Sequence, residues 1–130
     1  MAAMAGAGVT ATPAAVLLDR LPQLKLEDSQ PEIYDRPIGL RMLYQDPGSG
    51  AEHYLIRYPA GLRARHHRHS AAHTIIVLDG TMEANGQLLH AGSYAHFPAG
   101  TMMHHAPAHD EHCLFVIIFD GPFDVIPADV

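Results

Sequence analysis

The chain has 130 residues, a length that fits one domain with a sizeable core. Hydrophobic residues make up 48% of it and charged residues 17%, which is typical of globular proteins and unlike disordered or coiled-coil chains. The formal charge of −6, from eight Lys plus Arg against fourteen Asp plus Glu, argues against nucleic acid as a partner, because that affinity comes from clustered cations. No run of about 18 apolar residues occurs, so we predict no membrane span and a cytoplasmic location.

The N-terminal part, residues 1–37, is predicted to be a short irregular arm. Its first dozen residues lack the cationic start of a secretory signal, and we expect them to be flexible or loosely docked. The apolar positions between 17 and 26 lie in a stretch too short and too proline-broken for a stable helix. We interpret this stretch as a lead-in that packs across a neighbouring chain.

From residue 38 onward the pattern changes to short β-like runs, and 38–130 is predicted to be one β-domain. Each run ends in turn residues such as Pro, Gly, Asn or Asp. The expected strands cover 40–44, 54–58, 73–78, 81–83, 87–90, 93–97 and 113–119. Short strands at a spacing of roughly ten residues, with almost no helical period, indicate an all-β antiparallel sandwich or barrel of the jelly-roll type.

Histidine is unusually frequent, with eleven residues in the chain. His67, His69 and His73 have the same parity, so on an extended strand their side chains leave one face, the face that Ile75 and Val77 continue. Buried imidazoles without partners would cost on the order of 1–3 kcal/mol each. One shared metal ion would satisfy all three, and we predict a metal site here.

These histidines lie in a motif that resembles the first motif of the cupins. That motif is a glycine, five residues, His-x-His, three residues, a further ligand, six residues and a glycine. The chain matches every interval with Gly61, His67, His69, His73 and Gly80. The family most often has glutamate where His73 stands, so the resemblance implies the four-histidine minority of cupins and a site without a ligand charge.

The second cupin motif is matched in part. A glycine, five residues and Pro-x-Gly are present as Gly92 and Pro98-Ala99-Gly100, but the position of the family's last histidine holds Met103. One extra residue in the turn would make His104 the fourth ligand. Two extra residues, or unbroken strand parity, would make it His105. We prefer His104 and keep His105 as the alternative.

The resemblance covers roughly residues 40–119 and implies a double-stranded β-helix with one divalent transition metal per chain. Fe or Mn is favoured, with Zn, Ni or Cu as alternatives. It also implies a homodimer and a small-molecule substrate. The expected pocket wall is apolar and suits a hydrophobic substrate; it consists of Ala95, Phe97, Met102, Met103 and Phe115.

Three functions are compatible with such a site. The first is a dioxygenase that oxidises an enolisable or aromatic substrate with O2, and this is our leading hypothesis. The second is a non-oxidative Lewis-acid cyclase, isomerase or lyase, as in the cupin polyketide cyclases. The third is a non-catalytic metal-bound sensor or binding module, similar to the cupin half of anti-sigma regulators. Neither motif contains a carboxylate placed for acid–base work, so a mechanism with a carboxylate base has little support.

Overall fold

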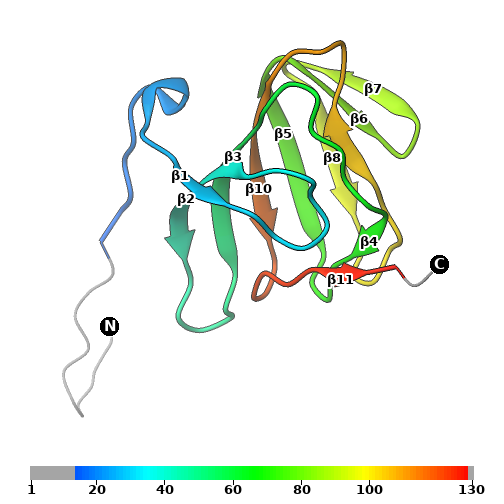
Figure 1. Cartoon of the computed structure of the whole chain (residues 1–130). Coiled ribbons are helices and arrows are strands. Elements are labelled where there is room, and N and C mark those ends of the chain that lie inside the picture. The colour runs from blue at the N-terminus through cyan, green and yellow to red at the C-terminus, as the bar shows by residue number, and fades with distance from the viewer. Residues whose placement is uncertain (1–13, 129–130) are drawn as a thin grey trace, which may run out of the picture.

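The computed structural model describes residues 14–128, so the first dozen residues, expected to be flexible, lie outside the described part. The larger layer is a six-stranded antiparallel sheet in the order β1-β2-β3-β10-β5-β8 (Figure 1). Its strands are β1 (Glu27–Ser29), β2 (Ile38–Gln45), β3 (Glu52–Tyr58), β10 (Cys113–Phe119), β5 (His73–Asp79) and β8 (Tyr94–Phe97). No helix in residues 14–128 is long and apolar enough to cross a membrane.

A second, smaller layer faces this sheet (Figure 1). It contains the three-stranded sheet β7-β6-β9 and the pair β11-β4. Their bounds are β7 (Gln87–His90), β6 (Thr81–Ala84), β9 (His105–Pro107), β11 (Ile126–Pro127) and β4 (His67–Arg68). Within the described residues the helical content is one 3-10 turn, η1 (Leu21–Gln23). The predicted all-β antiparallel fold is therefore confirmed.

The two parts of the smaller layer are joined by an antiparallel bridge between His67 and Met103. Each residue donates its backbone N–H to the carbonyl of the other, at N···O distances of 2.9 Å and 2.8 Å. This bridge places the start of β4 beside the chain that leads into β9. Two segments almost 40 residues apart in the sequence thus supply neighbouring side chains to the interior.

The core lies between the layers and is built from alternate residues of the central strands. Ile117 of β10 pairs with Tyr54 of β3 and with Ile75 of β5, and all three side chains are buried. Burying one large apolar side chain stabilises the fold by roughly 1.5–3 kcal/mol. The same alternation places Phe119 opposite His73, so the histidine stands at one end of an apolar face.

Two sequence-based expectations need correction. Residues 27–29, inside the segment predicted to be an irregular arm, form β1 and pair with β2. The expectation that His67, His69 and His73 share one extended strand is also wrong. The chain bends between β4 and β5, and the two strands belong to different sheets.

The glycine that closes the first motif has a steric reason. Gly80 lies between β5 and β6 with φ at 77°. A Cβ atom there would lie 2.1 Å from the carbonyl oxygen of His112. Only glycine fits this tight connection, which carries the chain from one layer to the other directly after the strand that starts at His73.

Candidate metal centre

Three buried histidines converge between the two layers. His67 belongs to β4, His69 follows that strand directly, and His105 opens β9. Their exposed fractions are 0%, 3% and 2%. One ring nitrogen from each lies within 4.8 Å of those of the other two, close enough for all three to contact one cation.

The Nδ1 atoms of His67 and His69 face backbone carbonyls. His67 Nδ1 lies 2.9 Å from the oxygen of Arg65, and His69 Nδ1 hydrogen-bonds the oxygen of Asp124. The Asp124 carboxylate also accepts the backbone N–H of Ser70, at 2.8 Å, which fixes the segment before β11 against the histidines. Because a carbonyl only accepts, both rings donate from Nδ1 and keep an unshared electron pair on Nε2.

His105 is anchored differently, by the hydroxyl of Tyr58, which lies 2.6 Å from its Nδ1. The Nε2 atoms of His67, His69 and His105 are buried and have no hydrogen-bond partner. In all three rings Nδ1 is thus held by an oxygen atom, while Nε2 faces the cluster and has no partner. Metal-binding histidines in proteins are held in this manner.

The donor set fits a divalent transition metal. Imidazole nitrogens suit Zn, Cu, Fe and Ni, and each ligand has to be neutral to bind. Burial lowers the pKa of His67 to about 4, and it also lowers the pKa values of His69 and His105. All three rings are therefore neutral at pH 7. A cation would satisfy three buried ring nitrogens that have no partner, each of which otherwise costs about 1–3 kcal/mol.

His73 lies next to this cluster but outside its compact set of three. It is 1% exposed, and neither ring nitrogen has a hydrogen-bond partner. Its ring centre lies 4.7 Å from that of His69 and 5.0 Å from that of Phe97, on which it stacks. Burial lowers its pKa to about 3. His67, His69 and His105 therefore gather at one place. His73 lies beside them, and neither of its ring nitrogens is held by a hydrogen bond.

The structure brings His105, and not the preferred His104, into the cluster. The His104 side chain is 23% exposed, and its Nδ1 lies 3.0 Å from the carboxylate of Glu83. Its ring stacks on that of His66, with centres 5.0 Å apart. The cause is strand alternation: Met103 points inward opposite His67, so His105 points inward too and His104 points outward.

Most residues of the expected pocket wall lie in the interior of the barrel. Phe97, Met103 and Phe115 are buried, and Ala95 packs against the core. Met102 is 43% exposed and faces outward, again because it alternates with Met103.

Sequence reasoning missed two aromatic side chains beside the cluster. The Phe119 ring lies 5.1 Å from His69 and 5.3 Å from His73, and the Phe123 ring lies 5.9 Å from His69. The alternation of Phe115 and Ile117 in β10 could have identified Phe119. No strand pattern could have identified Phe123, because it lies in an irregular segment.

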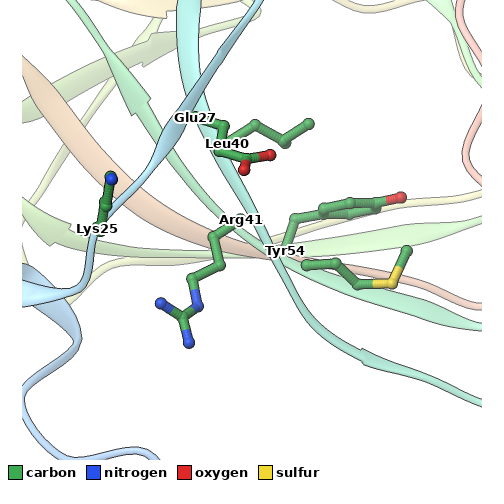
Figure 2. A pocket seen from close by; sticks show the side chains of 6 residues that line it. Lys25, Glu27, Leu40, Arg41 and Tyr54 are labelled. Carbon is green, nitrogen blue, oxygen red and sulfur yellow. The ribbon is translucent and has the colours of Figure 1, made fainter.

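A surface depression of about 440 Å³ lies over β2 and β3 (Figure 2). Its lining combines apolar and charged side chains, namely Lys25, Glu27, Leu40, Arg41, Met42 and Tyr54. The Tyr54 ring lies 5.5 Å from Phe123 and 6.3 Å from Phe119. Since both phenylalanines contact His69, a continuous row of aromatic rings leads from the depression to the histidines.

Residues 31–124 match the family model described as the ChrR cupin-like domain. This range includes the four buried histidines and the neighbouring Phe119 and Phe123. A search of curated proteins finds no match to the chain.

Solved structures share the fold at low sequence identity. An acetylacetone dioxygenase from Acinetobacter johnsonii is 18% identical, with a TM-score of 0.70 over 95% of this chain and 83% of that chain. The polyketide cyclase RemF from Streptomyces resistomycificus is 15% identical, with a TM-score of 0.67 over 88% and 87%. The anti-sigma ChrR from Rhodobacter sphaeroides, in complex with SigE, is 16% identical, with a TM-score of 0.62 over 78% and 52%.

Proposed function

The chain belongs to the ChrR cupin-like domain family, and from this premise we propose that it is a metal-dependent enzyme that oxidises a small hydrophobic substrate with O2. One observation carries the proposal: three buried imidazoles, each held at Nδ1, present unpartnered Nε2 atoms to a common point. We propose His67, His69, His105 and His73 as the ligands of one divalent metal. Fe or Mn is the favoured ion.

The residues around the site define what it would accept. Phe97, Phe119 and Phe123 pack against the histidines and would exclude water from a bound substrate. This apolar wall favours a hydrophobic molecule over a sugar or a phosphate. The metal, when bound, would supply Lewis acidity and the redox step.

Glu52, the one buried carboxylate among residues 14–128, is already engaged in hydrogen bonds, and this limits which substrates could react. Glu52 accepts hydrogen bonds from the Tyr54 hydroxyl at 2.5 Å, from the Gln45 amide at 3.2 Å and from the Phe123 N–H at 3.3 Å. Because both of its oxygens already accept hydrogen bonds, this carboxylate is not positioned to take a proton from a substrate. The substrate should therefore be one that loses its proton readily, such as a β-diketone or another enolisable compound.

The test is oxygen consumption by the metal-loaded protein. Protein purified without added metal is analysed for its elements, then loaded with Fe(II) or Mn(II) and mixed with a panel of β-diketones and hydroxylated aromatics in an oxygen electrode. We expect uptake of O2 with at least one β-diketone, incorporation of ¹⁸O from ¹⁸O2 into the product, and no uptake by the His67→Ala/His69→Ala variant. Conversion of a substrate without O2 would instead support the cyclase or lyase alternative.

The family match favours a second candidate, a metal-bound binding module without turnover. The solved ChrR structure is a complex with SigE, and this chain covers 52% of the ChrR chain. Tightly held zinc without an exchangeable water ligand, together with no conversion of any substrate, would favour this candidate over the enzyme.

A further inference from the structure

A short chain of hydrogen bonds runs from the metal centre into the barrel wall. The Tyr58 hydroxyl lies 2.6 Å from His105 Nδ1, and the Tyr34 hydroxyl lies 2.6 Å from that of Tyr58. The exposed fractions of the three residues are 8% for Tyr34, 0% for Tyr58 and 2% for His105. The Tyr58 ring also stacks on that of His105, with the ring planes inclined by 22°.

This anchor differs in kind from those of the other two ligands. The carbonyls that face His67 and His69 can only accept, so each of these rings has one neutral tautomer in the cluster, with its proton on Nδ1. A phenol can either donate or accept. His105 alone of the three can therefore carry its proton on either nitrogen without losing its anchor.

We propose that Tyr58 and Tyr34 form a relay that decides which nitrogen of His105 carries the proton, and that this makes His105 the conditional ligand of the centre. This inference rests on the proposed metal site. Tyr58 and Tyr34 act as positioning residues, because they touch neither the metal nor a substrate.

Without metal, each hydrogen bond of the relay is donated toward His105. Nε2 of His67 and Nε2 of His69 each carry an unshared pair and lie within 4.8 Å of Nε2 of His105. A proton on this third nitrogen forms no hydrogen bond there, but it removes the repulsion that a third unshared pair would add. His105 Nδ1 then accepts from the Tyr58 hydroxyl, and Tyr58 accepts from Tyr34. Each of the two short hydrogen bonds is satisfied in this direction.

With metal, each hydrogen bond of the relay has to be donated in the opposite direction, away from His105. The cation takes the place of the proton on Nε2, so His105 carries its proton on Nδ1 and donates it to Tyr58. Tyr58 then donates to Tyr34, its one other hydrogen-bond partner among residues 14–128. The Nε2 proton leaves to solvent when the cation binds. Nδ1 takes the hydroxyl proton of Tyr58, Tyr58 takes that of Tyr34, and Tyr34, which is 8% exposed, takes one from solvent, so the number of protons on the three residues is unchanged. Tyr34 is thus needed as an acceptor in the metal-bound state alone.

The first test reads the tautomers directly. Two-bond ¹H–¹⁵N spectra of the metal-free protein, assigned with His→Gln variants, should show the Nδ1–H form for His67 and His69 and the Nε2–H form for His105. Saturation with Zn(II) should convert His105 to the Nδ1–H form. An Nδ1–H form of His105 in the metal-free protein would overturn the proposal.

The second test removes single oxygen atoms from the relay. Tyr58→Phe should weaken Zn(II) and Co(II) binding within the range of about 10–100-fold expected for loss of an outer hydrogen-bond partner. Tyr34→Phe should weaken binding by a smaller factor, although Tyr34 touches no histidine of the cluster, and should leave the metal-free tautomer of His105 unchanged. The visible spectrum of the Co(II) protein should shift in both variants.

Tyr54→Phe is the matched control. Tyr54 is also a buried tyrosine of β3, but its hydroxyl donates to Glu52 and not to the relay. Its variant should keep the wild-type metal affinity and the wild-type Co(II) spectrum. Equal affinities of wild type, Tyr34→Phe and Tyr58→Phe would overturn the relay and leave the metal site standing, whereas wild-type protein that binds no metal would reject the site itself. Should Tyr58→Phe fail to fold, Tyr34→Phe and the tautomer spectra still decide the question.

Discussion

At two places in the chain, two consecutive histidines point to opposite sides of the barrel wall. His67 and His105 point inward, with ring centres 5.2 Å apart, while their neighbours His66 and His104 point outward and stack at 5.0 Å. The residue type, the chain positions and the ring spacing are nearly the same. The surroundings are opposite: the inner pair is buried, whereas His66 is exposed and His104 meets the carboxylate of Glu83.

The two pairs have nearly the same ring spacing but differ in how their ring nitrogens are held. The inner rings have Nδ1 held by an oxygen and Nε2 left free, and burial keeps them neutral. In the outer pair, His104 Nδ1 already has a carboxylate partner and both rings have access to water, so these nitrogens are not left buried without a partner. The predictions that follow compare these two surfaces of the same two segments.

The largest effect is expected when two inner ligands are removed. Loss of a hydrogen-bond partner of a ligand weakens metal binding by about 10–100-fold. His67→Ala/His69→Ala should weaken it by more than this factor, because it removes two proposed ligands themselves. His66→Ala/His104→Ala should bind metal as the wild type does. Calorimetric titration with Zn(II) measures both, and the melting temperature should rise with metal in the outer variant alone. Equal affinity in the two double variants would remove the distinction between inside and outside.

A smaller contrast is expected between two neighbouring single variants. His105→Ala should weaken metal binding strongly because one of three converging nitrogens is lost. His104→Ala should leave the affinity unchanged, since that ring faces Glu83. The same titration decides between them. Loss of binding in His104→Ala with retention in His105→Ala would restore the ligand that the sequence motif favoured.

That ambiguity shows where sequence reasoning ends. Turn residues and short β-runs were enough to predict the antiparallel all-β fold and most of its strands, because glycine, proline and alternation act locally. Motif spacing also identified His67 and His69. The choice between His104 and His105 depends on a bridge between His67 and Met103, a contact between distant segments that no local pattern encodes.

The two shortest strands and the oxygens that hold the Nδ1 atoms could not be predicted from the sequence either. β4 spans two residues and β11 spans two, too few to show a period. The oxygens that hold the Nδ1 atoms come from two backbone carbonyls and from Tyr58, and a backbone carbonyl has no sequence signature. The sequence therefore predicted the residue type of the candidate site, and the tertiary structure determines which ring nitrogens face its centre.

The inner rings should also make the metal-free protein sensitive to acid. Burial lowers the pKa of His67 to about 4 and that of His73 to about 3, against about 6.5 in the unfolded chain. As the pH falls below about 6.5, the unfolded chain gains protons that the folded protein does not. Stability that is fully present above this pH should be lost by up to about 1.4 kcal/mol per pH unit for each histidine, until the folded values are reached.

Urea unfolding between pH 7.5 and 4.5, in the presence of a chelator, measures this dependence. His73→Leu should reduce the slope below pH 6.5, because one buried group no longer titrates on unfolding. A free energy of unfolding that does not change across this range would contradict the buried, neutral state of the inner histidines.

The smallest effect is expected on the outside. Glu83→Gln removes the charge that faces His104 Nδ1 at 3.0 Å, in a pair whose side chains are 30% and 23% exposed. Ion pairs near the surface contribute about 0–1 kcal/mol, so the free energy of unfolding should change by no more than that. Metal affinity should not change, because Glu83 and His104 lie on the opposite side of the strand from the converging nitrogens. A loss of affinity comparable to that of His105→Ala would mean that the outer residues help to hold the metal. Strand alternation would then no longer explain why His105 is the proposed ligand and its neighbour His104 is not.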